Sequence, residues 1–308
     1  MSFFLLIFAL VLGYHRPESQ PDWLHNLVRP YAAWLEHNFN DGRKRHGTLA
    51  WVIGVLIPVL VAGVVSYALF SANEVLGAIF SLLMLYLALR VGRFGRMPEQ
   101  IAKKLRAGQL DEARDLLVEW QGGDALSYDA THIAKAGIER TLQNAHYELF
   151  APIFWFLIFS AAGLGAAGVL LYRLSWLLKN EWGEGQGDFG KFPARVFNWL
   201  DWLPARVTAA GFAVAGDFED AVYCWRTQAA EWPNEAQGII LASGAGALGV
   251  RLGNPLPAQD VPEYRPELGM GDEPDADYLQ SATGLVWRVL VVMLGLMLLL
   301  SFAHWLGS

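Results

Sequence analysis

Three long runs of apolar residues without a charged side chain constrain this sequence more than any other feature. They are Thr48–Phe70 with 23 residues, Leu149–Tyr172 with 24 and Val289–Leu306 with 18. A helix needs about 20 apolar residues to cross the hydrocarbon core of a bilayer. The runs therefore predict three transmembrane helices, and with them an all-α, polytopic integral membrane protein.

Three weaker segments extend the expected number to about four to six membrane helices. Val75–Leu89 is apolar but has only 15 residues. Ser2–Gly13 lacks the basic start and the small-residue cleavage site of a signal peptide, so we expect a retained first helix. Leu203–Gly216 contains Pro204 and Arg206, and a proline removes one helical hydrogen bond. We therefore expect a broken helix there.

Composition supports a membrane protein and excludes other classes. Charged residues make up 17% of the chain and hydrophobic residues 54%, whereas soluble domains average about 25% charged residues. The 23 Lys and Arg against 30 Asp and Glu give a net charge of −7, which provides no basic surface for nucleic acid. The single cysteine, Cys224, excludes an intrachain disulfide. We interpret it as a small buried apolar residue rather than a reactive thiol.

Basic residues near the apolar runs predict how the chain is oriented. Lys and Arg concentrate on the cytoplasmic side of membrane helices. Arg43-Lys44-Arg45 precede the run that begins at Thr48, and six further Lys or Arg follow Leu89, whereas the link between these two helices has none. Both basic flanks are therefore expected on the cytoplasmic side, with the link outside.

The remaining segments are expected to belong to the same membrane domain, residues 1–308. From about residue 98 to residue 148, apolar residues recur at helical spacing, with an interruption at Ala107-Gly108 and a new start near Asp129. This pattern predicts a cytoplasmic helical hairpin. Residues of about 250–284 hold several prolines and acids and are expected to form an irregular loop.

Two glycine patterns resemble nucleotide-binding motifs but lack their context. Gly185–Phe192 matches GxxxxGK, yet Phe192 replaces the Ser or Thr of a phosphate loop. Gly244–Gly249 matches GxGxxG, but no strand pattern precedes it. We interpret its small residues as sites of close packing between helices. The seven histidines do not pair at helical spacing, so no metal site is predicted.

One group of polar residues stands at the membrane end of the predicted hairpin. Glu139, Gln143 and Asn144 lie within about one helical turn of one another, and Glu139 shares a helix face with Gln143. The sequence leaves open whether they form a site or a solvated helix surface.

A second group contains two arginines. Arg195 and Arg206 flank the aromatic run Phe197–Trp202. An arginine at membrane depth is costly, so it marks either an anion site or a structural ion pair. Asp201 is the expected partner of Arg206 in the structural interpretation.

Several of these strings together resemble the CobD/CbiB family of cobalamin biosynthesis, which also includes the AmpE branch. The pairing of WLPAR with a later GALGVRLG is specific, and the order and approximate spacing of the motifs hold over most of the chain. The matching strings are IERTLQNAHYELFAPIFWF (Ile138–Phe156), YRLSWLL (Tyr172–Leu178), FGKFPARVFNWLDWLPARVTA (Phe189–Ala209), GALGVRLGNP (Gly246–Pro255) and RPELGMGD (Arg265–Asp272).

The resemblance implies a multi-pass inner-membrane protein. Enzymes of this family join aminopropanol phosphate to the propionate of adenosylcobyric acid, a corrinoid precursor, with ATP and Mg²⁺, and release adenosylcobinamide phosphate. The AmpE branch, in contrast, is linked to signalling. The resemblance thus leaves two functions open, an ATP-dependent amide-forming ligase and a non-catalytic accessory protein.

Several acidic positions of the active family are replaced in this chain. Gln143 stands where the family has a second Glu and Tyr147 where it has an Asp, and the Asp pair before WLPAR falls on Phe197 and Asn198. Acids are the ligands that would hold Mg²⁺. The departures favour the accessory function, while Glu139 and the C-terminal motifs favour the enzyme.

The resemblance also implies which residues form a site where the matching segments meet. Glu139 is expected to serve metal binding or proton transfer, and Asn144 to orient substrate. Arg206, Asn234 and Arg251 are expected to bind substrate, because a guanidinium makes bidentate contacts with phosphate or carboxylate and stays charged. If these residues serve only structure, the site is vestigial.

Overall fold

The computed structural model describes residues 2–15, 23–91, 93–183, 187–254 and 264–307. Helices dominate these residues, and the extended pairing found among them is limited to two isolated bridges, Val250 with Asp272 and Leu252 with Leu268. The all-α prediction is confirmed. The contacts divide the chain into two compact units, Met1–Gly92 with Tyr147–Pro204, and Arg93–His146 with Ala205–Ser308. They are called unit 1 and unit 2 below, and each is described by itself.

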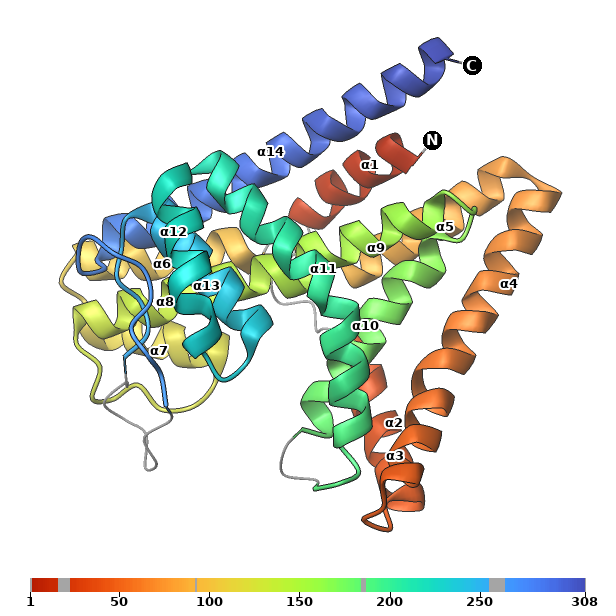
Figure 1. Cartoon of the computed structure of the whole chain (residues 1–308), viewed down its shortest axis with the longest axis horizontal. Coiled ribbons are helices and arrows are strands. Elements are labelled where there is room, and N and C mark those ends of the chain that lie inside the picture. The colour runs from red at the N-terminus through yellow and green to blue at the C-terminus, as the bar shows by residue number, and fades with distance from the viewer. Residues whose placement is uncertain (1, 16–22, 92, 184–186, 255–263, 308) are drawn as a thin grey trace. The chain divides into compact units, whose positions relative to one another are not determined.

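Unit 1 is built from apolar helices that pack around buried aromatic residues (Figure 1). Trp182 is fully buried and its indole donates to the carbonyl of Ala32 at 3.2 Å. Asn73 begins a helix because its side chain accepts the amide hydrogen of Val75 at 2.8 Å. The helices of this unit are α1 (Ser2–Tyr14), α2 (Trp23–Phe39), α3 (Lys44–Trp51), the π-helical turn η1 (Val52–Leu56), α4 (Ile57–Ala72), α5 (Glu74–Ala88), α9 (Ala151–Ser160), α10 (Gly165–Glu181) and the first part of α11 (Lys191–Ala215).

Unit 2 places a buried helix, α13, beside α12 (Figure 1). A Cβ added at Gly246 would lie 2.4 Å from the carbonyl oxygen of Asp220, so only glycine allows this approach. The GxGxxG pattern therefore serves packing, as interpreted from the sequence. The helices are α6 (Arg93–Arg106), α7 (Leu110–Gln121), α8 (Ala130–Ala145), the last part of α11, α12 (Phe218–Gln228), η4 (Ala229–Glu231), α13 (Glu235–Leu248) and α14 (Ala276–Gly307). The π-helical turn η2 (His146–Phe150) begins in this unit and continues into unit 1.

Two helical segments are long and apolar enough to cross a bilayer, Lys44–Ala72 and Ala276–Ala303. They contain two of the three predicted runs. Two shorter apolar helices, Phe3–Tyr14 and Glu74–Ala88, match the weaker segments. From Val291 onward α14 carries exposed apolar side chains, whereas apolar residues of its first half, such as Leu279 and Leu285, are buried. These helices support association with a membrane.

The prediction of one transmembrane helix over Leu149–Tyr172 is wrong. The chain turns at Ala161–Leu164 and divides the run into α9 and α10, which pack against each other. A Cβ at Gly168 would lie 2.4 Å from the carbonyl oxygen of Trp155, so the small residues of the run allow a tight helical hairpin. Hydropathy records how apolar a run is and does not register such a turn.

The prediction of a broken helix over Leu203–Gly216 is also wrong. α11 continues through Pro204. A proline at position 204 leaves the carbonyl four residues earlier, that of Leu200, without its helical donor. The indole N–H of Trp155 donates to this carbonyl at 3.2 Å. A side chain from α9 therefore replaces the hydrogen bond that Pro204 removes.

Three helices, α6, α7 and α8, occupy most of residues 98–148, where the sequence predicts a hairpin. The interruption at Ala107-Gly108 separates α6 from α7, and α8 begins after Asp129, whose carboxylate accepts from the backbone N–H of His132 at 2.8 Å. The irregular segment ends at Asp275, because α14 begins at Ala276.

Candidate functional site

Glu139 is the buried acid at the centre of unit 2. It lies on α8 and is 5% exposed. One carboxylate oxygen, Oε1, accepts from the backbone N–H of Gly253 at 2.9 Å. The other, Oε2, accepts from the guanidinium of Arg265. The interpretation of Glu139 as part of a solvated helix surface is therefore wrong.

The segment after α13 is shaped to reach Glu139. Gly253 has a φ of 74°, and a Cβ there would lie 2.0 Å from the carbonyl oxygen of Pro266. Arg265 lies over the ring of Trp232, with its guanidinium carbon 5.4 Å from the ring centroid. Buried charges are stable only when they are paired and hydrogen-bonded. Here the carboxylate has two donors, and the cation has both a carboxylate and an aromatic face.

Gln228 fixes the same segment from α12. Its amide nitrogen donates to the carbonyl of Gly269 at 3.1 Å, and its amide oxygen accepts from the Gly269 N–H at 2.7 Å. Together with the Glu139–Arg265 pair, this double contact holds Gly253, Arg265 and Gly269 against α8 and α12. We call these contacts the loop anchor.

Asn144 is the second predicted residue on α8. Its side chain is buried, with 4% exposure, and its amide nitrogen has no hydrogen-bond partner among the described residues. A buried amide without a partner costs about 1–3 kcal/mol. Asn144 thus retains two donors that a bound group can use.

Arg206 and Asn234 lie near the start of α13. The guanidinium of Arg206 donates to Glu235 Oε1 at 2.7 Å. Asn234 caps the helix, because its side-chain oxygen accepts from the Gln237 N–H at 3.1 Å. The sequence pointed to Asp201 as the partner of Arg206. Asp201 is buried and accepts from the hydroxyl of Tyr172 at 2.7 Å.

Arg251 lies at the edge of the loop anchor. Its guanidinium forms an ion pair with Glu273 at 3.1 Å, in which both side chains are partly exposed. Arg206 likewise pairs with a carboxylate, Glu235, that is 65% exposed. Exposed pairs are weak, with a median of about 0–1 kcal/mol. A ligand anion can therefore displace either carboxylate at little cost.

Unit 1 contains buried polar groups that the sequence-based choice of residues missed. Glu148 is 3% exposed, and its carboxylate lies 3.8 Å from the Arg90 guanidinium. Arg173 is fully buried, and its guanidinium carbon lies 4.8 Å from the centroid of the Trp176 ring. Both are charged residues at the border of an apolar run, which is the sequence signal that could have found them.

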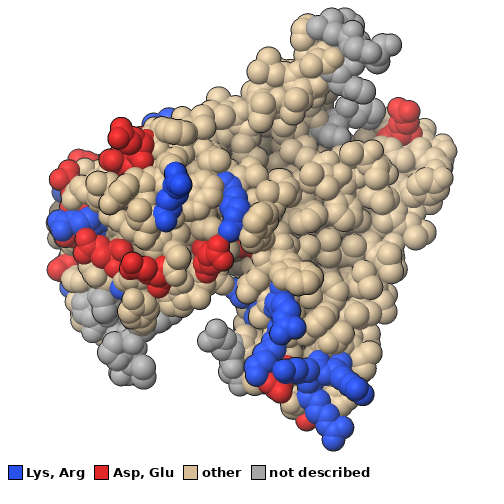
Figure 2. Space-filling view, viewed as in Figure 1, with Lys and Arg blue, Asp and Glu red and all other residues tan. Residues whose placement is uncertain are grey.

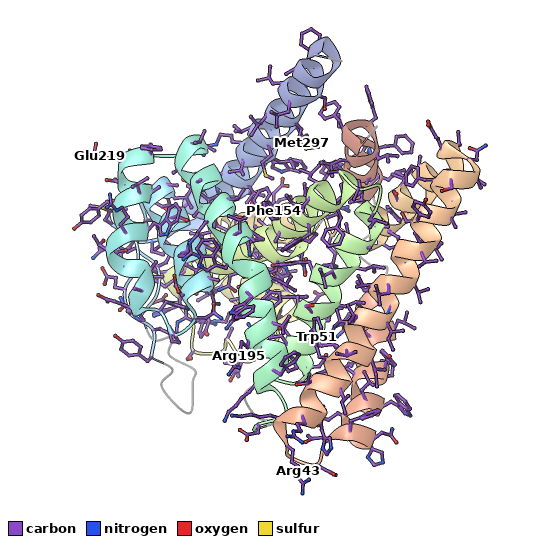
Figure 3. The ribbon with its side chains drawn as sticks, turned by 45° about the vertical axis from the view of Figure 1, so that its right-hand side comes forward. Arg43, Trp51, Phe154, Arg195, Glu219 and Met297 are labelled. Atoms are coloured by element: carbon purple, nitrogen blue, oxygen red, sulfur yellow. The ribbon has the colours of Figure 1, made fainter. Side chains whose placement is uncertain are left out.

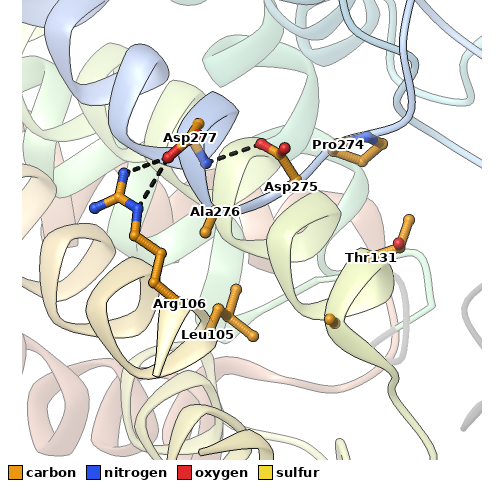
Figure 4. A pocket seen from close by; sticks show the side chains of 8 residues that line it. Leu105, Arg106, Thr131, Pro274, Asp275, Ala276 and Asp277 are labelled. Carbon is orange, nitrogen blue, oxygen red and sulfur yellow. Dashed lines mark hydrogen bonds and ion pairs between the residues drawn. The ribbon is translucent and has the colours of Figure 1, made fainter. Parts of the chain in front are cut away.

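A small hollow of about 260 Å³ lies between α6, α8 and the start of α14 (Figure 4). Arg106 and Asp277 line it and are joined by two hydrogen bonds of 2.9 and 2.7 Å. Because these charges neutralise each other and none of the predicted site residues lines the hollow, we do not place the site there.

No group of three or more His, Cys, Asp or Glu able to hold a metal ion occurs among the described residues. Mg²⁺ in nucleotide enzymes is held by one or two carboxylates together with substrate phosphates. The described residues therefore fit a Mg²⁺ ion that is held mainly by substrate phosphates, with one carboxylate oxygen from the protein. Glu148 Oε2, which is buried and has no hydrogen-bond partner among them, is such an oxygen.

These features define a class of protein. The chain is an all-helical protein with helices of membrane-crossing length and a buried, ion-paired acid that anchors an irregular loop. The family model of the CobD/CbiB protein matches residues 6–286. The chain therefore belongs to the CobD/CbiB family of cobalamin biosynthesis.

Individual relatives agree with this assignment. The chain is 36% identical over 297 residues to the cobalamin biosynthesis protein CobD of Stutzerimonas stutzeri, covering 94% of each chain. It is 37% identical over 208 residues to CobD of Chromobacterium violaceum, covering 67% of this chain and 65% of the relative. CobD of Brucella suis is 26% identical over 288 residues, with 88% and 87% covered. No solved structure matches the chain.

Proposed function

We propose that this chain is a membrane-bound, ATP-dependent adenosylcobinamide-phosphate synthase. The observation that carries the proposal is the 36% identity to a CobD protein over 94% of both chains, combined with a buried Glu139 that keeps its charge partners. The substrates are adenosylcobyric acid and aminopropanol phosphate, and ATP activates the propionate before the amine attacks it.

The site residues divide into a positioning group and a binding group. Glu139 positions the segment around Gly253 through the loop anchor. Asn144 offers its two amide hydrogens to a substrate oxygen. Arg206 and Arg251 exchange their exposed carboxylate partners for phosphate groups of the substrates. Asn234 orients the α13 N-terminus, where Arg206 lies.

Mg²⁺ bound with ATP supplies charge neutralisation at the phosphates. Glu148 is the residue of this chain that would contact it. The departures from the active family at Tyr147 and Phe197 leave unit 1 with fewer carboxylates near Glu148, so most of the ligands come from ATP phosphates and water.

We further propose that both units form one multi-pass domain of an inner membrane. The basic residues Arg43-Lys44-Arg45 and the helices α6–α8 lie on the cytoplasmic side, where ATP is available. Two long and two shorter apolar helices support this topology, and the lipid bilayer is their partner.

Complementation tests the proposal. A strain without its own synthase receives this chain and is scored for cobalamin made from supplied adenosylcobyric acid. Growth supports the enzyme, and the Arg206→Ala variant, which loses an anion contact, is expected to grow poorly. Absence of growth despite confirmed membrane insertion would favour the second function, a non-catalytic AmpE-like accessory protein, which the lost acids suggest.

A further inference from the structure

One face of α11 in unit 1 carries exposed residues that the proposed reaction has not used. Trp199 is 79% exposed and Trp202 is 54% exposed, and Arg195 and Asn198 are exposed as well. Residues 195, 199 and 202 follow the i, i+4, i+7 spacing of a single helix face. Large aromatic side chains so exposed on one face mark a binding surface.

Arg195 gives this face a single positive charge. Figure 2 shows Lys and Arg gathered at the end of unit 1 where α3 and α11 begin, and Figure 3 labels Arg195 near the start of α11. Among the described residues, no carboxylate forms an ion pair with Arg195, whereas Lys191, one turn earlier, is paired with Asp188. The guanidinium of Arg195 thus offers its hydrogen-bond donors to an anion.

We infer that the face formed by Arg195, Asn198, Trp199 and Trp202 binds the corrin ring of the corrinoid precursor, with Arg195 on its propionate carboxylate. This inference rests on the proposed function. The two indoles offer flat apolar surfaces to a large ring system. The side-chain amide of Asn198 can form hydrogen bonds with the amide groups at the edge of the corrin ring. From residue 195 to residue 202 the face extends about 10 Å along the helix, which suits a macrocycle better than a small metabolite.

A lipid surface is the competing partner, since tryptophan also gathers at membrane interfaces. The next residue on the same helix face, Arg206, pairs with Glu235, and this carboxylate is 65% exposed. If the tryptophans lay at a membrane interface, the next turn of the helix face would lie in the hydrocarbon core, where an ion pair is costly. The small-molecule ligand is therefore favoured.

Equilibrium dialysis of the full-length protein in detergent tests the inference with two probes. One is adenosylcobyric acid, and the other is the same compound with its free propionate converted to a primary amide. Trp199→Ala and Trp202→Ala are each expected to raise the dissociation constant for both probes by about tenfold. Arg195→Gln is expected to weaken binding of the acid by about tenfold and to leave the amide unchanged.

Two exposed residues of unit 1 supply matched controls. Trp34 on α2 is 54% exposed, and Arg45 is an exposed cation on α3. Trp34→Ala and Arg45→Gln are expected to bind both probes like the unmodified protein. Arg195→Gln should weaken binding of the acid but not of the amide. Partial unfolding would weaken binding of both probes.

Four outcomes would overturn the inference. The corrin site is excluded if the tryptophan variants bind both probes like Trp34→Ala. It is also excluded if Arg195→Gln affects binding of the acid and the amide equally. In both cases the proposed function stands. Unchanged affinities together with reduced membrane insertion of the tryptophan variants assign the face to lipid. If the unmodified protein binds neither probe, the proposed function fails as well.

Discussion

The ion pair of Glu139 with Arg265 in unit 2 is largely shielded from water, because the two side chains are only 7% and 11% exposed. Removing one member of a buried pair leaves an uncompensated charge and costs about 3–5 kcal/mol. We therefore expect Arg265→Met to lower the free energy of unfolding by about 3 kcal/mol, measured by thermal or denaturant unfolding in detergent.

The control for this variant is Arg251→Met, since Arg251 and Glu273 form a partly exposed pair. Its expected cost is below about 1 kcal/mol. In the double variant Glu139→Gln/Arg265→Met no buried charge remains, so it should be more stable than Arg265→Met alone. Equal losses for Arg265→Met and Arg251→Met would contradict the buried pair.

Cys224 on α12 gives a prediction about reactivity. Burial, with a further contribution from the Asp220 carboxylate, raises the pKa of the Cys224 thiol to about 11. The thiolate is the reactive form, so at pH 8 only about a thousandth of the thiol is ionised. Native protein should therefore react very slowly with maleimide at pH 8 and completely after denaturation in SDS. Complete labelling of the native protein within minutes would show an accessible thiol.

Among the elements, α11 is continuous because a distant side chain compensates its proline. Trp155→Phe removes the N–H that reaches Leu200, and leaving this carbonyl without a donor should cost about 1–3 kcal/mol. Pro204→Ala restores a backbone N–H four residues after Leu200. We therefore expect Pro204→Ala to recover much of the stability lost by Trp155→Phe, which a double-mutant cycle of unfolding free energies measures. Additive effects would contradict the compensation.

The N-terminus of α8 gives a pH dependence. Burial alone would raise the pKa of Asp129, but hydrogen bonds from the backbone and side chain of His132 outweigh it and lower this pKa. A carboxyl whose native pKa lies below its unfolded value stabilises the fold fully above the unfolded pKa. That contribution is lost as the pH falls through the native pKa. Asp129→Asn keeps the cap, so it should reduce the loss of stability in acid while changing stability at pH 7 by about 1 kcal/mol or less.

The sequence could predict those helix boundaries that depend on neighbouring residues alone. The spacing of apolar residues located the break at Ala107-Gly108, and Asp129 marked the start of α8. The same local rules failed at Pro204, because the compensating Trp155 lies 49 residues earlier in the sequence. They failed also at Ala161–Leu164, because hydropathy has no sign for a turn between two apolar helices.

The site was predictable only in part for a related reason. Motif resemblance selected Glu139 and Asn144 on α8, and both are buried. The partner of Glu139, Arg265, lies 126 residues further along the chain. No periodicity joins positions so far apart. Arg206 pairs with Glu235, 29 residues later, a partner that the sequence did not indicate because Asp201 is nearer along the chain.

For the molecule as a whole, the proposed topology places Asn73 and Gln109 on opposite sides of the membrane. In a Cys224→Ala background, Asn73→Cys should react with a membrane-impermeant maleimide added outside intact cells, and Gln109→Cys only after the membrane is opened. Because Asn73 precedes α5 and Gln109 precedes α7, the pair reports on the segment between them. Labelling of both from one side would contradict the topology.

The central claim is that this member of the CobD/CbiB family still catalyses amide formation. Purified protein in detergent is incubated with adenosylcobyric acid, aminopropanol phosphate, ATP and Mg²⁺, and the products are identified by mass spectrometry. We predict adenosylcobinamide phosphate and one ADP for each amide formed, with at least about a tenfold lower rate for Arg206→Ala. Folded, corrinoid-binding protein that forms no amide under these conditions would contradict the claim.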